Sequence, residues 1–355
     1  MSDVIIAAAG GGKTTRIVKQ ALGGRTEKCA LVTYTQNNVG EITDKLYGLN
    51  RSIPPQIEVR SWYSFLLREM ARPYQSTLIS GRINGIHWSQ KRSDRFAKQT
   101  DINRFYFAAE RRIYSDKMAQ FICACDKASN GAVVRRLEQR FDQIYLDEVQ
   151  DLAGYDLDLV ELILRSNLKM TLVGDHRQST YRTNNSARNT GYVGVKIRKK
   201  FEEWQKMGLC DLTYELETHR CNQSIADLAD KFFPEEPKTI SLNKATTGHD
   251  GVFVICSTDV SAYVAEYRPQ VLRLDVKTDC CGYEAMNFGE SKGSTFDRVL
   301  IFPHQLGKKW LSSGDFSLVS GSASKLYVGV TRARYSVAFV LDEEIKVAGV
   351  SRREP

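Results

Sequence analysis

The sequence predicts an α/β protein with two parallel sheets and a mainly helical, basic insertion in the first of them. Short apolar segments alternate with amphipathic ones through both halves of the chain, which is the rhythm of parallel strands joined by crossover helices. Residues 71–136, which are rich in Lys and Arg, interrupt that rhythm. A chain of 355 residues can bury two or three domain cores. We therefore expect two α/β domains and one insertion.

The first predicted strand leads into a phosphate-loop pattern. Residues 4–8 (VIIAA) have the composition of a buried strand, and the spacing of Ile17, Val18 and Leu22 predicts an amphipathic helix after the loop. Between them the string AAAGGGKT fits the pattern A/G-x-x-x-x-G-K-S/T. A glycine-rich turn without a ligand is the alternative, and the partner motifs described below count against it.

The residue types of this loop indicate its chemistry. Gly10, Gly11 and Gly12 let backbone N–H groups surround phosphate oxygens, and the N-terminus of the following helix adds positive potential. Lys13 is expected to reach the outer phosphates, and the hydroxyl of Thr14 is expected to bind Mg²⁺. The loop therefore predicts a nucleoside triphosphate site.

Similar segments place the other elements of the first half. Apolar runs bounded by polar turns predict strands over residues 29–33, 57–61, 143–146 and 170–173. Periodic segments predict helices over residues 62–70 and 155–167, and a loop with a connecting helix over residues 184–207.

The second half repeats the pattern after a boundary that we expect near residues 209–211. A helix is predicted over residues 224–233 and ends at Pro234. Strands are predicted over residues 252–256, 271–274, 299–302 and 337–341. The predicted domains are residues 1–70 with 137–210, the insertion 71–136, and residues 211–355.

The net charge of +8 is concentrated in the insertion. Between Ala71 and Arg136 there are 13 Lys and Arg against 5 Asp and Glu, so this stretch holds the whole excess. Aromatic residues are interleaved with the cations: Trp88, Phe96, Phe105, Tyr106, Phe107, Tyr114 and Phe121. Such a segment suits a polyanion with stackable bases. For the charge we favour nucleic acid, whereas most of the aromatic residues are expected to form the insertion's own core.

Composition excludes several other classes of protein. The eight cysteines show no CxxC pair and no Cys/His ligand spacing, so we expect reduced thiols and neither disulfides nor zinc. No stretch approaches the roughly 18 apolar residues of a membrane span, and the first strand runs straight into the phosphate loop without a signal-peptide pattern. We expect a cytoplasmic protein with no membrane partner.

Two carboxylates and a glutamine complete the expected nucleotide site on the first domain. Asp147 and Glu148 end a predicted strand in the run YLDEVQD. Asp147 can hold Mg²⁺ beside the phosphate loop, and Glu148 can orient and deprotonate the attacking water. Gln178, in the run VGDHRQSTYR, can hydrogen-bond the terminal phosphate or that water, and Tyr181 could stack on a base.

Two arginines of the second half match the other requirement of phosphoryl transfer, a cation for the departing phosphate. Arg220 lies in LETHRC before a predicted helix, and Arg332 lies in KLYVGVTRAR beside a predicted strand. Because they belong to a different α/β unit from the phosphate loop, they predict arginine fingers in a site that closes when ATP binds. Each arginine alone is more commonly a surface ion-pair partner.

Taken together, the motifs resemble those of superfamily 1 helicases of the UvrD/Rep/PcrA type, in family order over nearly the whole chain. AAAGGGKT resembles AGAGSGKT, LVTYTQNNVGEI resembles LVLTFTNKAAREM, and VRSWYSFLLREM resembles VGTFHSFCLRIL. YLDEVQD resembles VDEYQD, VGDHRQSTYR resembles VGDDDQSIYR, and LETHRCNQSI resembles LEQNYRSTQRI. FGESKGSTFDRVLIF resembles VHSSKGLEFDVVFI, and YVGVTRAR is nearly the family's own string.

The resemblance implies two RecA-like domains, ATP with Mg²⁺ as cofactors, and ATP-driven movement on single-stranded DNA or a tailed duplex, usually 3′ to 5′. The residues that match catalytic positions are Lys13, Glu148, Gln178, Arg220 and Arg332. The nucleotide-binding set is Ala9, Gly10, Gly11, Gly12, Lys13, Thr14, Thr15, Arg16, His219 and Gly293, with Thr14 and Asp147 on the metal. The strand-contacting set is Tyr34, Thr35, Ser61, Trp62, Tyr63 and Tyr181.

The chain departs from the family pattern in length and in a few positions. Only about 65 residues separate LETHRC from SKG, where the family carries a large insertion, so the second accessory domain is absent or vestigial. The family's adenine-reading glutamine has no counterpart among Met1, Ser2 and Asp3, and Thr295 stands where a ribose-binding glutamate is expected.

Three functions stay open from the sequence. The first is an active motor, a DNA-stimulated ATPase that translocates and unwinds. The second is an ATP-switched DNA-binding subunit of a larger assembly, for instance with a nuclease in phage defence or repair. The third, a phosphate-loop kinase or GTPase, leaves the paired arginines and the DNA-type motifs unexplained.

Overall fold

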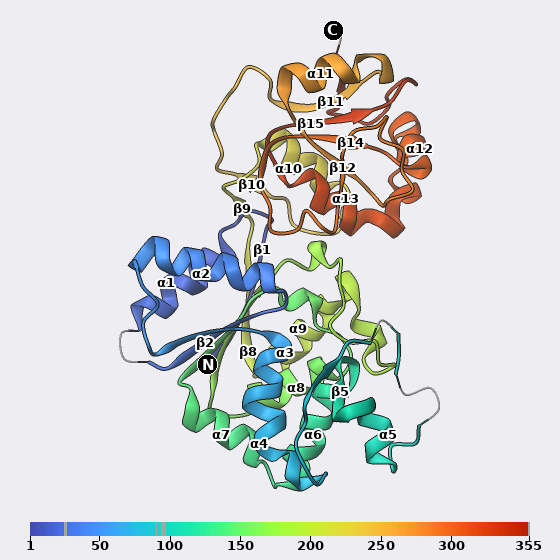
Figure 1. The fold of residues 1–355 in the computed structure, drawn as a ribbon. Coiled ribbons are helices and arrows are strands. Elements are labelled where there is room, and N and C mark those ends of the chain that lie inside the picture. The colour runs from blue at the N-terminus through green and yellow to red at the C-terminus, as the bar shows by residue number, and fades with distance from the viewer. Residues whose placement is uncertain (25–26, 90, 94–96, 354–355) are drawn as a thin grey trace. The chain divides into compact units, whose positions relative to one another are not determined.

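The computed structural model describes residues 1–24, 27–89, 91–93 and 97–353, which form two compact units (Figure 1). The first unit comprises residues 1–6, 13–176 and 181–214, and the second comprises residues 7–12, 177–180 and 215–355. Each unit contains a six-stranded sheet with helices. The predicted fold class, two α/β units with parallel sheets, is confirmed.

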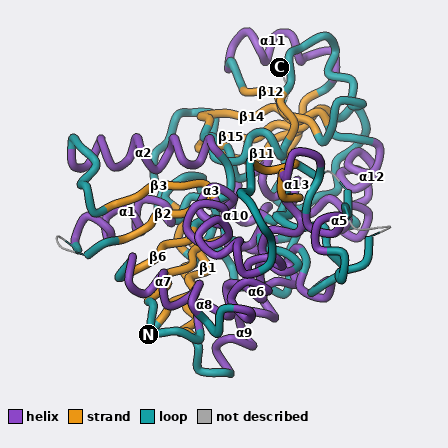
Figure 2. The backbone as a smooth tube through the Cα atoms, turned by 60° about the horizontal axis from the view of Figure 1, so that its bottom comes forward, coloured by secondary structure: helices purple, strands orange, loops and turns teal. Residues whose placement is uncertain are grey.

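The sheet of the first unit has the strand order β3-β2-β6-β7-β1-β8, and Figure 2 shows β3, β2, β6 and β1 within it. Its strands are β1 (Ser2–Ala7), β2 (Cys29–Thr33), β3 (Ile57–Ser61), β6 (Gln143–Leu146), β7 (Lys169–Gly174) and β8 (Cys210–Glu215). Pairing is parallel from β3 through to β1, with Val4 opposite Leu172 and Leu146 opposite Leu172 on its other side. The carboxyl ends of these strands therefore share one edge.

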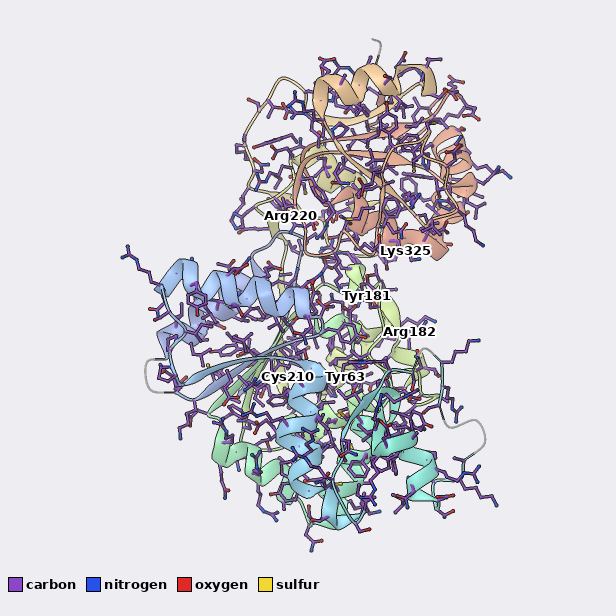
Figure 3. The ribbon with its side chains drawn as sticks, viewed as in Figure 1. Tyr63, Tyr181, Arg182, Cys210, Arg220 and Lys325 are labelled. Carbon is purple, nitrogen blue, oxygen red and sulfur yellow. The ribbon has the colours of Figure 1, made fainter. Side chains whose placement is uncertain are left out.

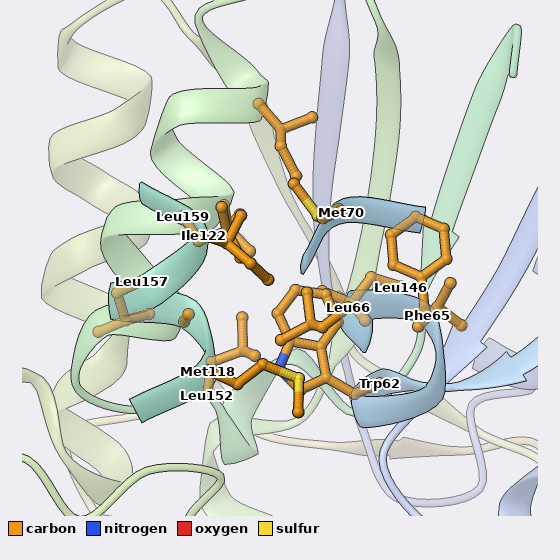
Figure 4. Packing of buried hydrophobic residues seen from close by; sticks show 14 of the residues in the cluster. Trp62, Phe65, Leu66, Met70, Met118, Ile122, Leu146, Leu152, Leu157 and Leu159 are labelled. Carbon is orange, nitrogen blue, oxygen red and sulfur yellow. The ribbon is translucent and has the colours of Figure 1, made fainter. Parts of the chain in front are cut away.

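Helices cover both faces of this sheet because residues along a strand alternate between its faces. Ile5 packs with Ile17 of α1 in one buried cluster, whereas Val4 and Ile6 belong to another that includes Trp62. Figure 4 shows part of the second cluster, with Trp62, Phe65, Leu146 and Leu159 labelled. The helices are α1 (Lys13–Gly23), α2 (Gln36–Asn50), α3 (Trp62–Phe65), α8 (Tyr155–Leu164) and α9 (Ile197–Lys206). A π-helix over Leu66–Ala71 continues α3.

The predicted basic insertion is mainly helical, as expected. Its helices are α4 (Arg72–Tyr74), α5 (Ile102–Tyr106), α6 (Met118–Ala128) and α7 (Ala132–Arg140), and it also contains a parallel pair of three-residue strands, β4 (Gly85–His87) and β5 (Arg112–Tyr114). The sequence did not predict this strand pair, since three residues are too few for a periodic pattern. Three residues counted in the predicted character of the insertion, the acid Asp94, the base Arg95 and the aromatic Phe96, lie outside the described residues.

Most aromatic residues of the insertion form its core, as predicted. Phe105, Tyr106, Phe107 and Phe121 are buried and pack edge to face. The ammonium of Lys117, itself buried, lies 3.9 Å from the centroid of the Phe105 ring, a cation–π contact that compensates its burial. Trp88, in contrast, has 63% of its surface exposed.

The second unit repeats the architecture, with the strand order β13-β12-β14-β15-β11-β16 and parallel pairing throughout. Its strands are β9 (Glu217–Thr218), β10 (Ile240–Ser241), β11 (Gly251–Ile255), β12 (Gln270–Arg273), β13 (Met286–Asn287), β14 (Phe296–Phe302), β15 (Ala333–Val340) and β16 (Ser351–Arg352). The short strands β9 and β10 form a separate parallel pair. Its helices are α10 (Gln223–Asp230), α11 (Val260–Tyr267), α12 (Gln305–Ser313) and α13 (Ala323–Val330).

The limits of the units differ in detail from the expected domain limits, which stay a prediction. The first unit runs to Tyr214, because β8 joins the first sheet beside β1. Helix α7 continues past Arg136 to Arg140. Among the described residues, no helix has the length and apolar character that crossing a membrane requires.

Two tryptophans offer a test of this packing. Trp310 is fully buried against Phe232, Phe316 and Phe339, whereas Trp88 is 63% exposed. Trp310→Ala should lower the free energy of unfolding by about 3–5 kcal/mol, since it removes a large core side chain and leaves a cavity. Trp88→Ala, the same chemical change at the surface, should shift it by no more than about 0.5 kcal/mol. Urea denaturation followed by far-ultraviolet circular dichroism measures both, and equal effects would contradict the assigned burial.

Candidate nucleotide and nucleic-acid sites

The phosphate loop is held in a conformation that requires glycine. Gly10 and Gly12 both have φ of +79°, in the left-handed region. A Cβ atom on Gly10 would lie 2.5 Å from the Cβ of Arg220, so a side chain there would also clash. The N–H of Gly11 donates to the carbonyl of Ala8 over 2.9 Å, which closes the turn.

The segment 7–12 packs within the second unit, on the residues around β9. The hydroxyl of Thr218 donates to the carbonyl of Ala9 over 2.6 Å, and the N–H of His219 donates to the carbonyl of Gly10 over 3.1 Å. The N–H of Ala9 donates to the hydroxyl of Tyr327 over 3.4 Å. His219 thus contacts the loop through its backbone. Sequence reasoning did not find Thr218 or Tyr327, which lie within motifs already identified but beside the residues singled out there.

The carboxylate cluster, defined here as Thr14, Asp147, Glu148 and Gln150, lies at the carboxyl edge of the first sheet. The hydroxyl of Thr14 donates to Oδ2 of Asp147 over 2.7 Å, although 132 residues separate them in the chain. The N–H of Glu148 donates to Oδ1 of Asp147 over 2.9 Å. Glu148 itself has φ of +58°, an unfavourable conformation for a side chain of its size. Two predicted metal ligands and the predicted base are therefore adjacent.

The electrostatics of Asp147 favour a cation. Burial, together with the charge of Glu148, raises the pKa of Asp147, and the hydroxyl of Thr14 and the ammonium of Lys13 oppose the rise. A buried carboxylate next to a second carboxylate is stabilised by a nearby positive ion. Oxygen ligands from a carboxylate and a hydroxyl, with phosphate oxygens and water, are what Mg²⁺ prefers. Thr14 and Asp147 therefore fit the expected metal.

Gln150 positions the predicted base. Its Nε2 donates to Oε2 of Glu148, and its Oε1 accepts from the N–H of Asp175, just after β7, over 3.2 Å. Gly174 lies directly against this side chain and has no space for a Cβ. Glu148 is thus tied through Gln150 to the end of a neighbouring strand. Gln150 stands two positions after Glu148 in YLDEVQD, and its role could not be predicted without knowing where β7 ends.

The arginine cluster, defined here as Gln178, Arg220 and Arg332, lies in the second unit. Arg332 is buried, and its Nη2 donates to Oε1 of Gln178 over 2.9 Å. Its Nε and Nη1 donate to the carbonyls of Val328 and Ser294 over 3.2 Å and 3.3 Å. The Nη1 of Arg220, labelled in Figure 3, donates to the carbonyl of Thr331 over 3.2 Å. The structure therefore brings Gln178 and Arg332 into direct contact.

A buried ion pair between Arg177 and Asp230 lies next to this cluster. Arg177 lies next to Gln178 in the chain, and its Nη1 donates to Oδ1 of Asp230 over 3.1 Å and to the Thr239 hydroxyl over 3.3 Å. Its guanidinium also lies 4.8 Å from the ring centroid of Tyr327, the residue whose hydroxyl accepts from the phosphate loop. Asp230 accepts in addition from the N–H of Thr239 over 2.6 Å. Arg177 is therefore fixed on three sides.

The remaining predicted nucleotide-binding residues lie at the start of α1 and in the turn before β14. Thr15 and Arg16 lie in the first turn of α1, directly after Lys13 and Thr14. Gly293 has φ of +92° in the turn that precedes β14, so this position also needs glycine.

Three of the predicted strand-contacting residues lie at the carboxyl ends of β2 and β3. Tyr34 is partly exposed, and its hydroxyl donates to the carbonyl of Arg182 over 3.4 Å. Thr35 caps α2, since its hydroxyl oxygen accepts from the N–H of Asn38 over 3.1 Å. The hydroxyl of Ser61 accepts from Nε2 of Gln36 over 3.3 Å. Thr35 and Ser61 thus have structural bonds.

The other three predicted strand contacts differ in exposure. Trp62 is 1% exposed and belongs to the core, so its ring offers no face to a base in this structure. Tyr63 is 5% exposed, and its hydroxyl donates to the carbonyl of Thr183. Tyr181, labelled in Figure 3, is 39% exposed. The motif spacing predicted a strand contact for all three residues. The ring of Tyr181 is accessible for such a contact, whereas that of Trp62 is buried in the core.

Asp156 is a second buried carboxylate, close to Trp62. It lies in the first turn of α8, is 2% exposed, and its Oδ2 has no hydrogen-bond partner within the described residues. Burial raises the pKa of Asp156 to about 7, and the nearby Thr183 hydroxyl and Trp62 indole oppose the rise. Sequence reasoning did not find Asp156, which looks like an ordinary helix N-terminal acid in YDLDLVELIL.

Comparison with known proteins identifies the class of part of the chain. Residues 83–196 match the family model of the UvrD/REP helicase N-terminal domain. This part of the chain is similar to that helicase family, which confirms the resemblance inferred from the motifs there. No curated protein matches the chain.

The chain also matches solved structures of arterivirus helicases, at low similarity. The chain matches the crystal structure of arterivirus nonstructural protein 10 (helicase) at 13% identity and TM-score 0.48, its complex with DNA at 14% and 0.49, and the PRRSV helicase at 16% and 0.45. The matches cover 96% of this chain in each case, but 59%, 60% and 52% of the other chains. The chain thus spans little more than half the length of these helicases.

The raised pKa of Asp156 predicts a specific pH dependence. Between about pH 4, the ordinary Asp pKa, and about pH 7, the carboxyl of Asp156 is ionised in the unfolded chain but protonated in the folded chain. This carboxyl therefore makes the folded state less stable as pH rises through that window, by at most about 4 kcal/mol. Asp156→Asn should match the parent near pH 4 and become more stable than it near pH 8, as measured by urea denaturation.

Asp315 provides a control of opposite sign. It is fully exposed, and hydrogen bonds from Ser317 lower its pKa. Asp315 therefore stabilises the folded state above the ordinary Asp pKa, and this stabilisation is lost as the pH falls through the lowered pKa of the folded state. Asp315→Asn should be less stable than the parent near neutral pH and approach it in acid. A stability gain for Asp156→Asn that does not change with pH would show that the carboxyl is not protonated in the folded state.

Proposed function

We propose that this protein is an ATP-dependent DNA translocase and helicase, an ATPase stimulated by single-stranded DNA, which uses Mg²⁺ and acts in the cytoplasm. The observation that carries the proposal is the hydrogen bond between Thr14 and Asp147, with Glu148 bonded beside it. It joins the helix after the phosphate loop to the strand end that carries the carboxylates. The family match over residues 83–196 supports the same conclusion.

The carboxylate cluster supplies the metal ligands and the base. Thr14 and Asp147 would hold Mg²⁺, which neutralises charge on the phosphates when it is bound. Glu148 accepts the proton of the attacking water, and the bond from Gln150 fixes the orientation of its carboxylate. Lys13 adds positive charge at the outer phosphates.

The arginine cluster supplies the charge that stabilises the transition state. Arg332 and Arg220 carry guanidinium groups that can bind phosphoryl oxygens in pairs. Because Arg332 donates to Gln178, a movement of either side chain when the terminal phosphate is bound or released would also move the other. The bonds to Val328 and Ser294 hold the Arg332 side chain in place, which reduces the entropy lost on binding.

The proposed polymer is single-stranded DNA, including the tail of a duplex, with movement 3′ to 5′. The excess of cations over residues 71–136 would neutralise backbone phosphates, and Tyr34 and Tyr181 would contact bases. A solved arterivirus helicase of similar fold has been crystallised with DNA. Salt should weaken such binding steeply, because condensed counterions are released.

The first test is hydrolysis with and without DNA. Single-stranded DNA should raise the ATPase rate, and Glu148→Gln should reduce the stimulated rate by at least about 100-fold, because a general base contributes on the order of 10²–10⁴. Glu344→Gln, the same change at an exposed position, should leave the rate unaltered. An ATPase rate that is the same with and without DNA, or that is unchanged by Glu148→Gln, would falsify the proposal.

Arg332 allows a test that separates chemistry from nucleotide binding. Arg332→Ala should lower the ATPase rate by about 10³-fold or more, as expected for an arginine finger, while binding of a fluorescent ATP analogue weakens far less. Arg332→Lys keeps the charge but loses the paired donors, and should recover little activity. Since Arg332 is buried, thermal melts of both variants must first show a folded protein. Near-parental activity of Arg332→Ala would exclude the assigned role.

An ATP-switched DNA-binding subunit is the second candidate. The favouring observation concerns residues 219–285, between β9 and β13. They contain only α10, β10, β11, a 3₁₀ helix (Ser257–Asp259), α11, β12 and the segments joining them, with no further domain in that span. Such a protein would bind DNA in response to ATP, displace strands poorly alone, and assemble with a partner such as a nuclease. Strand displacement on a tailed duplex by the purified protein decides between the two candidates.

A further inference from the structure

Tyr327, on α13, contacts both the phosphate loop and the segment that carries Gln178, all within the second unit. Its side chain is 1% exposed. The hydroxyl makes one contact and the face of the ring makes the other, so a substitution can remove either one alone. The tyrosine clamp, defined here as Tyr327, Arg177, Asp230 and Thr239, is the set of buried residues that the ring contact joins.

The hydroxyl of Tyr327 holds the peptide groups at the start of the phosphate loop. The N–H of Ala9 donates to this hydroxyl over 3.4 Å, and the carbonyl of Ala9 accepts from the hydroxyl of Thr218 over 2.6 Å. Ala9 is buried and directly precedes the three glycines that are expected to surround phosphate. A loop that is already ordered loses less entropy when its ligand binds. The hydroxyl therefore acts on the affinity for nucleotide.

The ring of Tyr327 holds Arg177. The guanidinium lies 4.8 Å from the ring centroid, and both side chains are buried, so water does not weaken this cation–π contact. On its other sides the guanidinium donates to Oδ1 of Asp230 over 3.1 Å and to the hydroxyl of Thr239 over 3.3 Å. The hydroxyl of Thr239 in turn donates to Oδ1 of Asp230 over 2.8 Å. The clamp thus fixes one arginine by a ring, a carboxylate and a hydroxyl.

The position of Arg177 determines that of Gln178. The two residues are consecutive in a 3₁₀ turn, His176–Gln178, so a shift of the first moves the backbone of the second. Gln178 accepts from Nη2 of Arg332 over 2.9 Å. Loss of the ring would therefore disturb the contact between Gln178 and Arg332, the two residues assigned to the terminal phosphate. The ring acts on the rate of hydrolysis once nucleotide is bound.

The clamp is a feature of this chain that the motif does not imply. Arg177 lies in VGDHRQSTYR at the position where the resembling string VGDDDQSIYR has aspartate. A second carboxylate there would be repelled by Asp230 and would find no attraction on the face of a ring. The pairing of Arg177 with Asp230 and Tyr327 consequently depends on residues that this sequence combines.

We propose that Tyr327 is a positioning residue for ATP hydrolysis with two separable effects. Its hydroxyl strengthens nucleotide binding through the phosphate loop, and its ring sets the hydrolysis rate through Arg177 and Gln178. Tyr327 acts through these neighbours and has no part in the chemical step itself. The inference rests on the proposed function, since it assumes that ATP is hydrolysed at this site.

Tyr327→Phe tests the effect of the hydroxyl, because it removes one oxygen and keeps the ring. The Kd of a fluorescent ATP analogue and the KM for ATP should both rise about threefold to tenfold, the size of one hydrogen bond. The kcat measured with single-stranded DNA should stay within about twofold of the parental value. An unchanged Kd, or a loss confined to kcat, would overturn this half of the proposal.

Tyr327→Leu tests the effect of the ring. The kcat should fall about tenfold or more, because a buried cation–π contact is lost and Arg177 is released. Arg177→Met should cause a similar loss of kcat, and the double variant should lose no more than the larger of the two single variants, since both changes break one contact. Losses that multiply in the double variant would show that the two residues act independently and would overturn this half.

Phe233→Leu is the matched control for packing. Its ring lies against that of Tyr327, with centroids 5.6 Å apart and planes at 74°. The variant makes the same change from a ring to an aliphatic side chain and should lower the Tm, but kcat should stay within about twofold. A kcat loss as large as that of Tyr327→Leu would reduce the effect to packing and defeat the inference. If thermal melts show that Tyr327→Leu does not fold, Arg177→Met decides: an unchanged kcat would overturn the role of the ring.

Assays of the parental protein separate the two proposals. Hydrolysis stimulated by single-stranded DNA, with parental Kd and kcat in both Tyr327 variants, would overturn the positioning role and leave the proposed function standing. A parental protein that binds the analogue without any stimulated hydrolysis would overturn the proposed function and the role of the ring. The Kd of Tyr327→Phe would still decide the role of the hydroxyl, because binding does not require hydrolysis.

Discussion

Parallel pairing of β6, β7 and β1 is the constraint on which the carboxylate cluster depends. Leu172 of β7 lies between Val4 and Leu146, so three strands that are distant in sequence end at the same edge. Thr14 then reaches Asp147, and Gln150 can span from Glu148 to the end of β7. A change of register by one residue would turn each strand's side chains to the other face and separate these groups.

A network of compensated buried charges links functional residues of the second unit. In the second unit Asp230 holds Arg177, the next residue Gln178 accepts from Arg332, and Arg177 lies on the ring of Tyr327. The Tyr327 hydroxyl in turn accepts from the phosphate loop. Breaking one member of such a network leaves another charge buried without a partner, which costs more than the bond itself contributes.

Sequence patterns predicted most of the longer strands well, because runs of β-branched residues are local signals, but helix α2 (Gln36–Asn50) was not predicted. Strands β2, β3 and β6 begin and end at the predicted residues. The strand pair β4 and β5 was not predicted, since three-residue strands have no period. Motif spacing likewise predicted a contact role for Trp62 and Tyr63 alike, although burial in the core removes the Trp62 ring from any surface. Accessibility depends on what packs above a residue, and a motif does not encode that.

The sequence by itself determined the class of chemistry: a glycine-rich loop with lysine and threonine, an Asp-Glu pair after a strand, and two arginines in a second α/β unit. These residues lie in short sequence motifs, and their residue types are the ones that bind phosphate and Mg²⁺. Only the tertiary structure decided the partners. Gln150, Tyr327 and Asp230 take their places because distant strands and loops converge, and the bonds and burial that result are properties of packed neighbours.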